Sequence, residues 1–400
     1  MKKGGMFTLS AFYFMFFIAM GFSTFASKYF AQIGLSGSQI GLLTSVPALV
    51  SMFFMPMWGA LADRVRYKKL VVAGTLSLAA VFLFLVDGVT DFTRLNVAAP
   101  DANATRFLPL LLILIANAFF GQAANPTATA IALEYTGARG KSFGPIRMMG
   151  TVGYQVGALA IGFICVTSLR YLYTYQAFGF LAGGLVALSM PNVRGHQFGV
   201  RKVSPFKALK DRRVLLVLGL VLIGTCTTMF YISFFGAYLE EMGVSNRIAS
   251  IITWISVFLE IPLLFFATQI MRRLSVWQWF IVGYALTGIR WLGFVLAHDL
   301  GSWQLLLVAQ IPAVTAMACF EFFPALYIGK IIAPELSGSA QTLLTLTSFG
   351  VAKVFGSLLG GFVSDWVGMR NIFLCFGILL LAAAAFLFPL CRKLTRAERA

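Results

Sequence analysis

The stretch Trp254-Ile-Ser-Val-Phe-Leu-Glu260-Ile-Pro262 forms the middle of an apolar run over residues 248–270. A run of this length can cross the hydrocarbon core of a bilayer as an α-helix, and this decides the class of the fold. Glu260 would then lie near the middle of the membrane, where inserting a charged side chain costs about 2.5–3.5 kcal/mol. We therefore interpret Glu260 as a functional residue whose partners lie on neighbouring helices.

Two other apolar runs supply candidate partners: Arg290 in residues 277–297 and Glu321 in residues 304–328. Because a helix rises 1.5 Å per residue, Glu260 is expected about 7–8 Å from each of them in depth, a step that an arginine side chain can bridge. The pattern predicts one cation between two acids, one of which titrates and couples transport to protons. A static ion network between the helices is the alternative, although buried ion pairs stabilise poorly.

A further cation, Lys353, lies within the apolar run over residues 339–363. It is expected either to contact a transported solute or to neutralise a leftover acid. Glu260 and Glu321 are the only acids that we expect within the membrane, so at least one of them should carry the proton.

The composition of the whole chain is that of a membrane protein. Of its 400 residues, 59% are hydrophobic and 11% are charged, which leaves too little polar surface for a water-soluble domain. Charges interspersed in the loops, and the lack of regular alternation in ten-residue segments, favour helices over a β-barrel.

The net charge of +17 comes from loops on one side of the predicted membrane, which carry most of the 31 Lys and Arg residues. This positive-inside pattern predicts a multi-pass protein of the cell membrane with both termini cytoplasmic. A nucleic-acid-binding surface would have to be assembled from short, separated loops, so nucleic acid is not expected as a partner.

Twelve apolar runs are predicted to be transmembrane helices. They cover residues 8–26, 40–58, 70–89, 107–133, 146–168, 171–190, 214–237, 248–270, 277–297, 304–328, 339–363 and 372–390. The long polar stretch over residues 192–213 separates six runs in residues 1–191 from six in residues 214–400, and we interpret it as a cytoplasmic linker between two bundles.

Polar residues in the first half recur at helical spacing. Asn117, Asn125 and Thr129 share one face of the fourth run, which Pro126 is expected to kink and which is long enough to extend beyond the bilayer. Arg147 and Tyr154 share a face of the fifth run. The first set either lines the solute path or forms hydrogen bonds between helices.

The sequence lacks the patterns that catalysis requires. It contains no nucleophile paired with a base and no glycine-rich phosphate loop, and its five cysteines are scattered without metal-ligand spacing. We therefore expect neither an enzyme nor a cofactor or metal site, and an ion gradient must supply the energy.

The motif Gly59-Ala-Leu-Ala-Asp63-Arg64, directly after the second run, closely resembles the signature loop of the major facilitator superfamily. The resemblance covers the whole chain and implies an all-α membrane protein of twelve transmembrane helices in two pseudo-symmetric six-helix bundles. Gly59, Asp63 and Arg64 would belong to a tight loop that holds one state of the gate closed. A plain cytoplasmic charge cluster is the alternative.

The motif Gly144-Pro-Ile-Arg147-Met-Met-Gly150-Thr151-Val-Gly153-Tyr154 is similar to the lactose permease and nucleoside:proton symporter branches of that superfamily. The resemblance implies that Arg147 and Tyr154 contact the solute. A glutamate that binds galactosides in the lactose permeases is replaced here by Thr129, which puts a lactose-type substrate in doubt.

The second half carries its own resemblance. Phe320-Glu321-Phe322-Phe323 looks like the nucleoside branch, and Glu260 with Arg290 look like an acid and an arginine of both branches. Met271-Arg272-Arg273 stands where a second signature loop is expected, without its Gly and Asp. The gate signature is therefore expected only in the first half.

Together these patterns predict a monomeric proton symporter for a neutral polar solute, such as a nucleoside or a small sugar or oligosaccharide. Drug or metabolite efflux by proton antiport is one alternative, and a membrane sensor that transports nothing is another. The sequence identifies neither the solute nor the coupling ion, so it does not exclude sodium as that ion.

Overall fold

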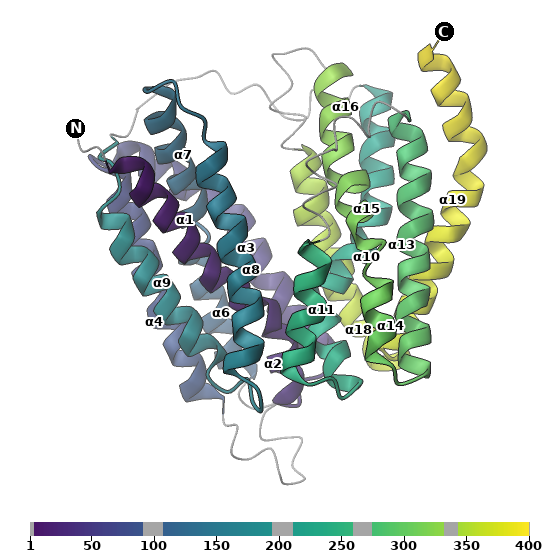
Figure 1. The fold of residues 1–400 in the computed structure, drawn as a ribbon, viewed down its shortest axis with the longest axis horizontal. Helices are drawn as coiled ribbons and strands as arrows, with labels where there is room; N and C mark the ends of the chain where they lie inside the picture. The colour runs from purple at the N-terminus through teal and green to yellow at the C-terminus, as the bar shows by residue number, and fades with distance from the viewer. Residues whose placement is uncertain (1–3, 91–106, 194–210, 259–273, 332–342, 400) are drawn as a thin grey trace. The chain divides into compact units, whose positions relative to one another are not determined.

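The computed structural model describes residues 4–90, 107–193, 211–258, 274–331 and 343–399, and within these ranges the regular structure is entirely helical. The chain forms two compact units. The first comprises Met1–Val200 and Ser245–Ile251, and the second comprises Arg201–Val244 and Ile252–Ala400. Figure 1 shows the helices of each unit packed side by side as a bundle.

The helices of the first unit cover the first half of the sequence. They are α1 (Gly5–Phe22), the short 3-10 turn η1 (Ser23–Phe25), α2 (Ala26–Gln32), α3 (Gly37–Arg64), α4 (Lys68–Val89), α6 (Phe107–Gly121), α7 (Ala124–Gly137), α8 (Gly144–Ile164) and α9 (Leu172–Leu188). The helix α11 (Asn246–Phe258) begins in this unit and continues in the second.

The second unit contains both long and broken helices. They are α10 (Arg212–Glu241), α13 (Val276–Asp299), α14 (Trp303–Ala309), α15 (Ala313–Met317), α16 (Phe323–Ile331), α18 (Gly360–Val367) and α19 (Met369–Arg399). Three π-helical segments interrupt them: η4 (Ala318–Phe322), η5 (Leu346–Val351) and η6 (Val354–Leu359).

Eight described segments are long and apolar enough to cross a membrane. They are Gly5–Gln32, Gly37–Met55, Lys68–Val89, Phe107–Gly137, Arg212–Glu241, Val276–Asp299, Leu343–Val367 and Met369–Arg396. Each coincides with a predicted span. The other predicted spans correspond to α8, the shorter α9, the described part of α11, and the broken run from α14 to α16. An all-α multi-pass membrane protein is thereby confirmed.

The kink expected in the fourth span is present. α6 ends at Gly121 and α7 begins at Ala124, so the break lies just before Pro126. Proline lacks the N–H that would bond the carbonyl four residues earlier, and its ring collides with that carbonyl at Gln122. α7 then continues to Gly137, four residues beyond the predicted end.

The tight loop expected at Gly59–Arg64 is not a loop. These residues form the last turns of α3, which ends at Arg64, and the chain becomes extended only at Val65 and Tyr67. The prediction of a loop here was wrong because hydropathy marks where the apolar segment ends, whereas Ala60, Leu61 and Ala62 favour the continuation of a helix in polar surroundings as well.

The tenth span was expected to be continuous, but it is interrupted twice. α14 ends at Ala309 and α15 begins at Ala313, with Pro312 in the break. The π-helical η4 then separates α15 from α16, whose second residue is Pro324. Pro312 lies at the start of a helix, where a missing backbone N–H is tolerated, and Pro324 follows directly on the π-helical turn η4.

Candidate functional site

In the first unit, α1 and α8 approach so closely that only glycine fits between them. A Cβ atom at Gly153 would lie 2.3 Å from the carbonyl oxygen of Phe14, and one at Gly157 would lie 2.2 Å from that of Ile18. From the other helix, a Cβ at Gly21 would lie 2.4 Å from the carbonyl oxygen of Tyr154. Small residues commonly allow this backbone contact between membrane helices.

This contact places Arg147 and Tyr154 against α1. The guanidinium carbon of Arg147 lies 4.8 Å from the ring centroid of Phe17, and Gly150 leaves room for both side chains. The Tyr154 hydroxyl is hydrogen-bonded to Thr24 Oγ1 at 3.0 Å. Arg147 is exposed and Tyr154 is half-buried, so both side chains are partly accessible while Phe17 on α1 and Thr24 on η1 contact them.

The polar face on α6 and α7 connects helices. Asn117 Nδ2 donates to the carbonyl oxygen of Ala79 on α4 at 3.1 Å. Thr129 Oγ1 is 2.7 Å from the Tyr13 hydroxyl on α1, and it also donates to the carbonyl oxygen of Asn125 at 2.8 Å. Of the two predicted roles, the structure therefore contains hydrogen bonds between helices, made by Asn117 and Thr129, whereas Asn125 contributes its backbone carbonyl.

The gate residues lie at the end of α3. Gly59 and Arg64 are exposed, and a Cβ at Gly59 would meet no atom within 4 Å. The side chain of Asp63 lies outside the described part of the structure, as does the whole of Glu260.

In the second unit, Arg290 is buried in α13, with 2% of its surface exposed. Its Nη2 donates to Gln310 Oε1 at 2.5 Å, and its guanidinium carbon lies 4.1 Å from the ring centroid of Tyr231 on α10. Gln310 Nε2 in turn donates to the Tyr231 hydroxyl at 3.3 Å. A closed Arg–Gln–Tyr cluster therefore joins three helical segments around one cation.

Gln310 and Tyr231 were not predicted. Gln310 caps α14 at the break before Pro312, and it is completely buried. Transporters often bind their substrates where a membrane helix is broken. Pro312, within an otherwise apolar run, was therefore the signal in the sequence that could have indicated a site at Gln310.

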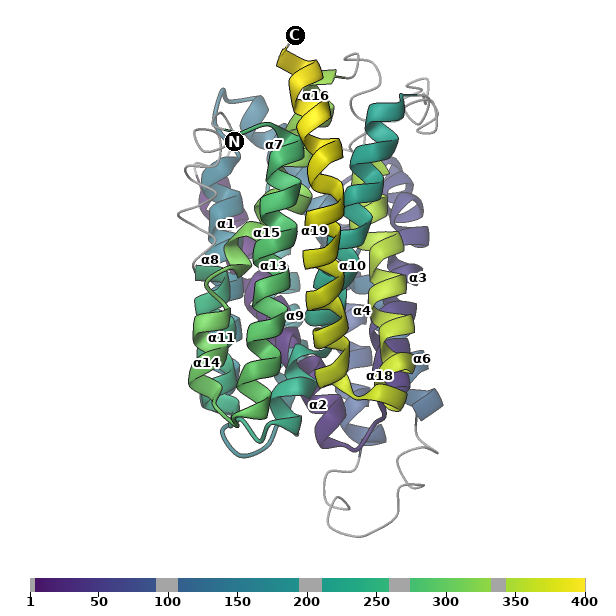
Figure 2. The ribbon, with the colours of Figure 1, turned by 90° about the vertical axis from the view of Figure 1, so that its right-hand side faces the viewer.

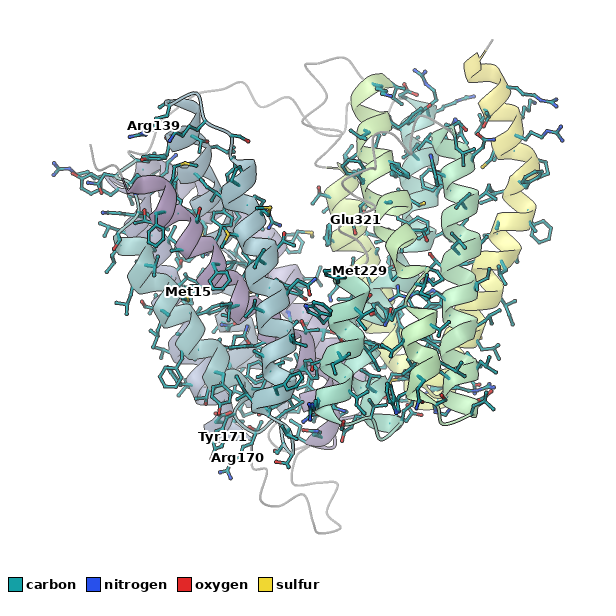
Figure 3. All side chains as sticks on the ribbon, viewed as in Figure 1. Met15, Arg139, Arg170, Tyr171, Met229 and Glu321 are labelled. Atoms are coloured by element: carbon teal, nitrogen blue, oxygen red, sulfur yellow. The ribbon has the colours of Figure 1, made fainter. Side chains whose placement is uncertain are left out.

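Glu321 lies in the π-helical segment η4 and is half-buried. Figure 3 shows it on the side of the second unit away from α19. Within the described residues, no ion pair joins it to Arg290, whose guanidinium is hydrogen-bonded to Gln310. The predicted bridge between Arg290 and Glu321 is therefore not seen.

Lys353 lies between the π-helical segments η5 and η6. Its Nζ donates to Ser233 Oγ on α10 at 2.9 Å, and the Ser233 and Ser357 hydroxyls are 2.5 Å apart. Gly356 makes this approach possible, because a Cβ there would lie 2.4 Å from the carbonyl oxygen of Cys226. The two serines, both buried, were not predicted.

Two of the ionisable residues predicted within the membrane therefore lie in or beside π-helical turns. Such turns are rare and occur frequently at functional sites, because the extra residue changes the direction of the side chains around it. Glu321 and Lys353 share this feature in the second unit.

The first unit contains charged residues that were not among the predicted site residues. Lys68 Nζ is 2.5 Å from Glu134 Oε1, in an ion pair whose cation is 3% exposed. Asp87, which was not counted among the membrane acids, lies in the last turn of α4 and accepts a hydrogen bond from Thr174. Hydropathy could predict neither the ion pair nor the hydrogen bond of Asp87, because it does not show which helices lie side by side.

Comparisons with known proteins agree in their classification. The family model described as "MFS_1 like family" matches residues 6–375. The chain is 26% identical to the uncharacterized transporter YwbF of Bacillus subtilis (strain 168), over 91% of this chain and 86% of that protein. It is 23% identical to the maltose permease of Geobacillus stearothermophilus, over 96% of this chain and 93% of that protein.

Among solved structures, the nucleoside transporter NupG superposes with a TM-score of 0.80 at 19% sequence identity. The superposition covers 96% of this chain and 98% of that one. At this identity the match concerns the fold alone.

Proposed function

Because the chain belongs to the MFS_1 like family of membrane transporters, we propose that it takes up a neutral polar organic solute together with protons by alternating access. Membership makes it a transporter rather than an enzyme, and a multi-pass membrane protein that binds a small molecule. The relatives named as a maltose permease and a nucleoside transporter support a small sugar or oligosaccharide, or a nucleoside, as the solute.

The observation that carries proton coupling is the environment of Glu321. Glu321 is half-buried within a membrane span, and the buried cation Arg290 is hydrogen-bonded to Gln310 rather than to this acid. An acid in an apolar span is costly as an anion, and it can avoid this cost by taking up a proton. One proton moving down about 100 mV and one pH unit releases about 2.3 plus 1.4 kcal/mol, enough for several-hundredfold accumulation.

We assign proton coupling to Glu260, Arg290 and Glu321, with Arg290 tuning the acids. The proposed solute contacts are Arg147, Tyr154, Asn117, Asn125, Thr129, Glu260 and Lys353. Support comes from Arg147 and Tyr154 on α8, which contact α1 and η1 respectively while both remain partly accessible.

Purified protein in proteoliposomes tests the function. A panel of nucleosides and of mono- and oligosaccharides is first screened by thermal shift, and the compounds that stabilise the protein are then assayed for counterflow and for uptake driven by an imposed pH gradient. Solute that accumulates inside when protons flow inward supports symport. Solute that moves opposite to the proton flow indicates antiport. A protein that binds the solute but never exchanges it would be a sensor.

We further propose that both termini and residues 192–213 are cytoplasmic, with 192–213 linking two bundles that move as units. In a variant without its native cysteines, Lys141→Cys should be protected from an impermeant maleimide added outside the cell, whereas Arg170→Cys should be labelled. Both positions are exposed, at opposite ends of predicted spans. The reverse labelling pattern would invert the topology.

The end of α3 is assigned to gating. Asp63→Asn keeps the size of the side chain and removes its charge, so we expect slower transport, by about tenfold, with solute affinity changed less than twofold. The measurement is initial uptake rate beside equilibrium binding. Loss of binding at an unchanged rate would contradict the role.

Gln310 is expected to orient the guanidinium of Arg290 through their hydrogen bond. Gln310→Glu would place a buried anion directly beside the guanidinium, and a close buried charge pair is commonly coupled by more than 1 kcal/mol. We expect this variant to lose pH-gradient-driven uptake at least tenfold and to change its pH profile, whereas Gln310→Asn should retain the wild-type profile. Identical pH profiles for the Glu variant and the wild type would count against this prediction.

A further inference from the structure

The last helix, α19, carries three cations beyond its apolar part. Arg392, Lys393 and Arg396 are exposed, and at about 100° per residue they fall within one arc of about 100°. We name this set the α19 basic stripe.

The opposite face of the same turns is fixed to the bundle. Cys391 is 1% and Thr395 5% exposed, and Thr395 Oγ1 is 2.6 Å from Ser275 Oγ, the residue that caps the start of α13. Figures 1 and 2 show α19 running along an edge of the second unit next to α13. The stripe therefore belongs to a docked helix with a fixed outward face.

The outward face is apolar immediately before the stripe. Ile378 and Phe388, which fall in nearly the same arc, are 57% and 53% exposed, and Phe386 at its edge is 84% exposed. In a membrane protein, large apolar side chains exposed on a spanning helix face the acyl chains. The surface changes from apolar to basic within four residues, a rise of about 6 Å from Phe388 to Arg392.

We propose that the α19 basic stripe is a binding site for the phosphodiester headgroups of anionic phospholipids. The position supports this occupant, because the polar region that borders the hydrocarbon core is only about 5–8 Å thick on each side. Arginine forks match phosphate oxygens in geometry, and cations near an anionic membrane surface each favour binding about fivefold. A soluble anion would gain nothing from the apolar surface that continues the stripe.

The test uses the full chain, purified in a neutral detergent, with binding of dioleoylphosphatidylglycerol and dioleoylphosphatidylcholine measured by native mass spectrometry. The wild type should prefer the anionic lipid at least tenfold, and the preference should fall as salt is raised. The triple variant Arg392→Gln, Lys393→Gln, Arg396→Gln should lose most of it. The charge-conserving variant Arg392→Lys, Arg396→Lys should retain it, and equal melting temperatures of all variants in phosphatidylcholine exclude misfolding.

The matched control removes three exposed cations elsewhere, as Lys141→Gln, Arg212→Gln, Lys330→Gln. It should keep the preference for the anionic lipid. An equal loss in this control would show that net charge and not the stripe is responsible, and the proposal would fail. Inorganic phosphate alone should neither stabilise the wild type nor displace the lipid, since displacement would identify a site for soluble anions instead.

Discussion

Glu321→Gln is expected to abolish uphill uptake while leaving equilibrium counterflow intact. Glutamine keeps the shape of the side chain in η4 and cannot release a proton. Exchange of solute for solute needs no net proton movement, whereas accumulation does, so the accumulation ratio should fall from several hundredfold to about one. Both modes are measured in proteoliposomes between about pH 5 and pH 9.

Glu260→Gln serves as the comparison, because we assign this residue to solute binding as well as to coupling. It should impair uphill uptake and counterflow together. Undiminished uphill uptake in a variant that combines Glu260→Gln with Glu321→Gln would mean that other residues carry the proton, or that another ion such as sodium drives the cycle. In that case the role assigned to the two acids would be wrong, although the transporter assignment would stand.

Gly157→Ala is expected to destabilise the first unit strongly. The added Cβ would lie 2.2 Å from the carbonyl oxygen of Ile18, and because that oxygen belongs to the backbone of α1, no rotamer change can clear the clash. The helices must separate, at a cost of about 3 kcal/mol. Separation would also move Arg147 away from Phe17 on α1 and Tyr154 away from Thr24 on η1.

Gly74→Ala is the matched control, since a Cβ at Gly74 in α4 would meet no atom within 4 Å. Alanine has the higher helix propensity by about 1 kcal/mol, so this variant should be as stable as the wild type or more stable. Thermal unfolding in detergent, followed by size-exclusion chromatography, measures both. Equal melting temperatures for Gly157→Ala and the wild type would show that the close contact between α1 and α8 contributes nothing to stability.

The comparison of predicted and observed helices shows where local patterns suffice. The break before Pro126 was predicted because a proline removes a specific backbone hydrogen bond whatever surrounds it. The same chemistry at Pro312 gives the break that holds Gln310, but the apolar residues on both sides led to the prediction of one continuous span. The extension of α3 through Arg64 was not predicted, because hydropathy marks the end of the apolar segment and the helix continues beyond that point.

The sequence by itself determined the class of fold, the positions of the spans and the candidate ionisable residues, because hydropathy and charge are properties of each segment alone. Only the tertiary structure decided their partners. Arg290 contacts Gln310 and Tyr231, which lie 20 and 59 positions away in the sequence, and Lys353 reaches Ser233 across 120 positions. Such pairings depend on which helices pack together, and that is decided by small residues such as Gly157 and Gly356, which let two backbones touch.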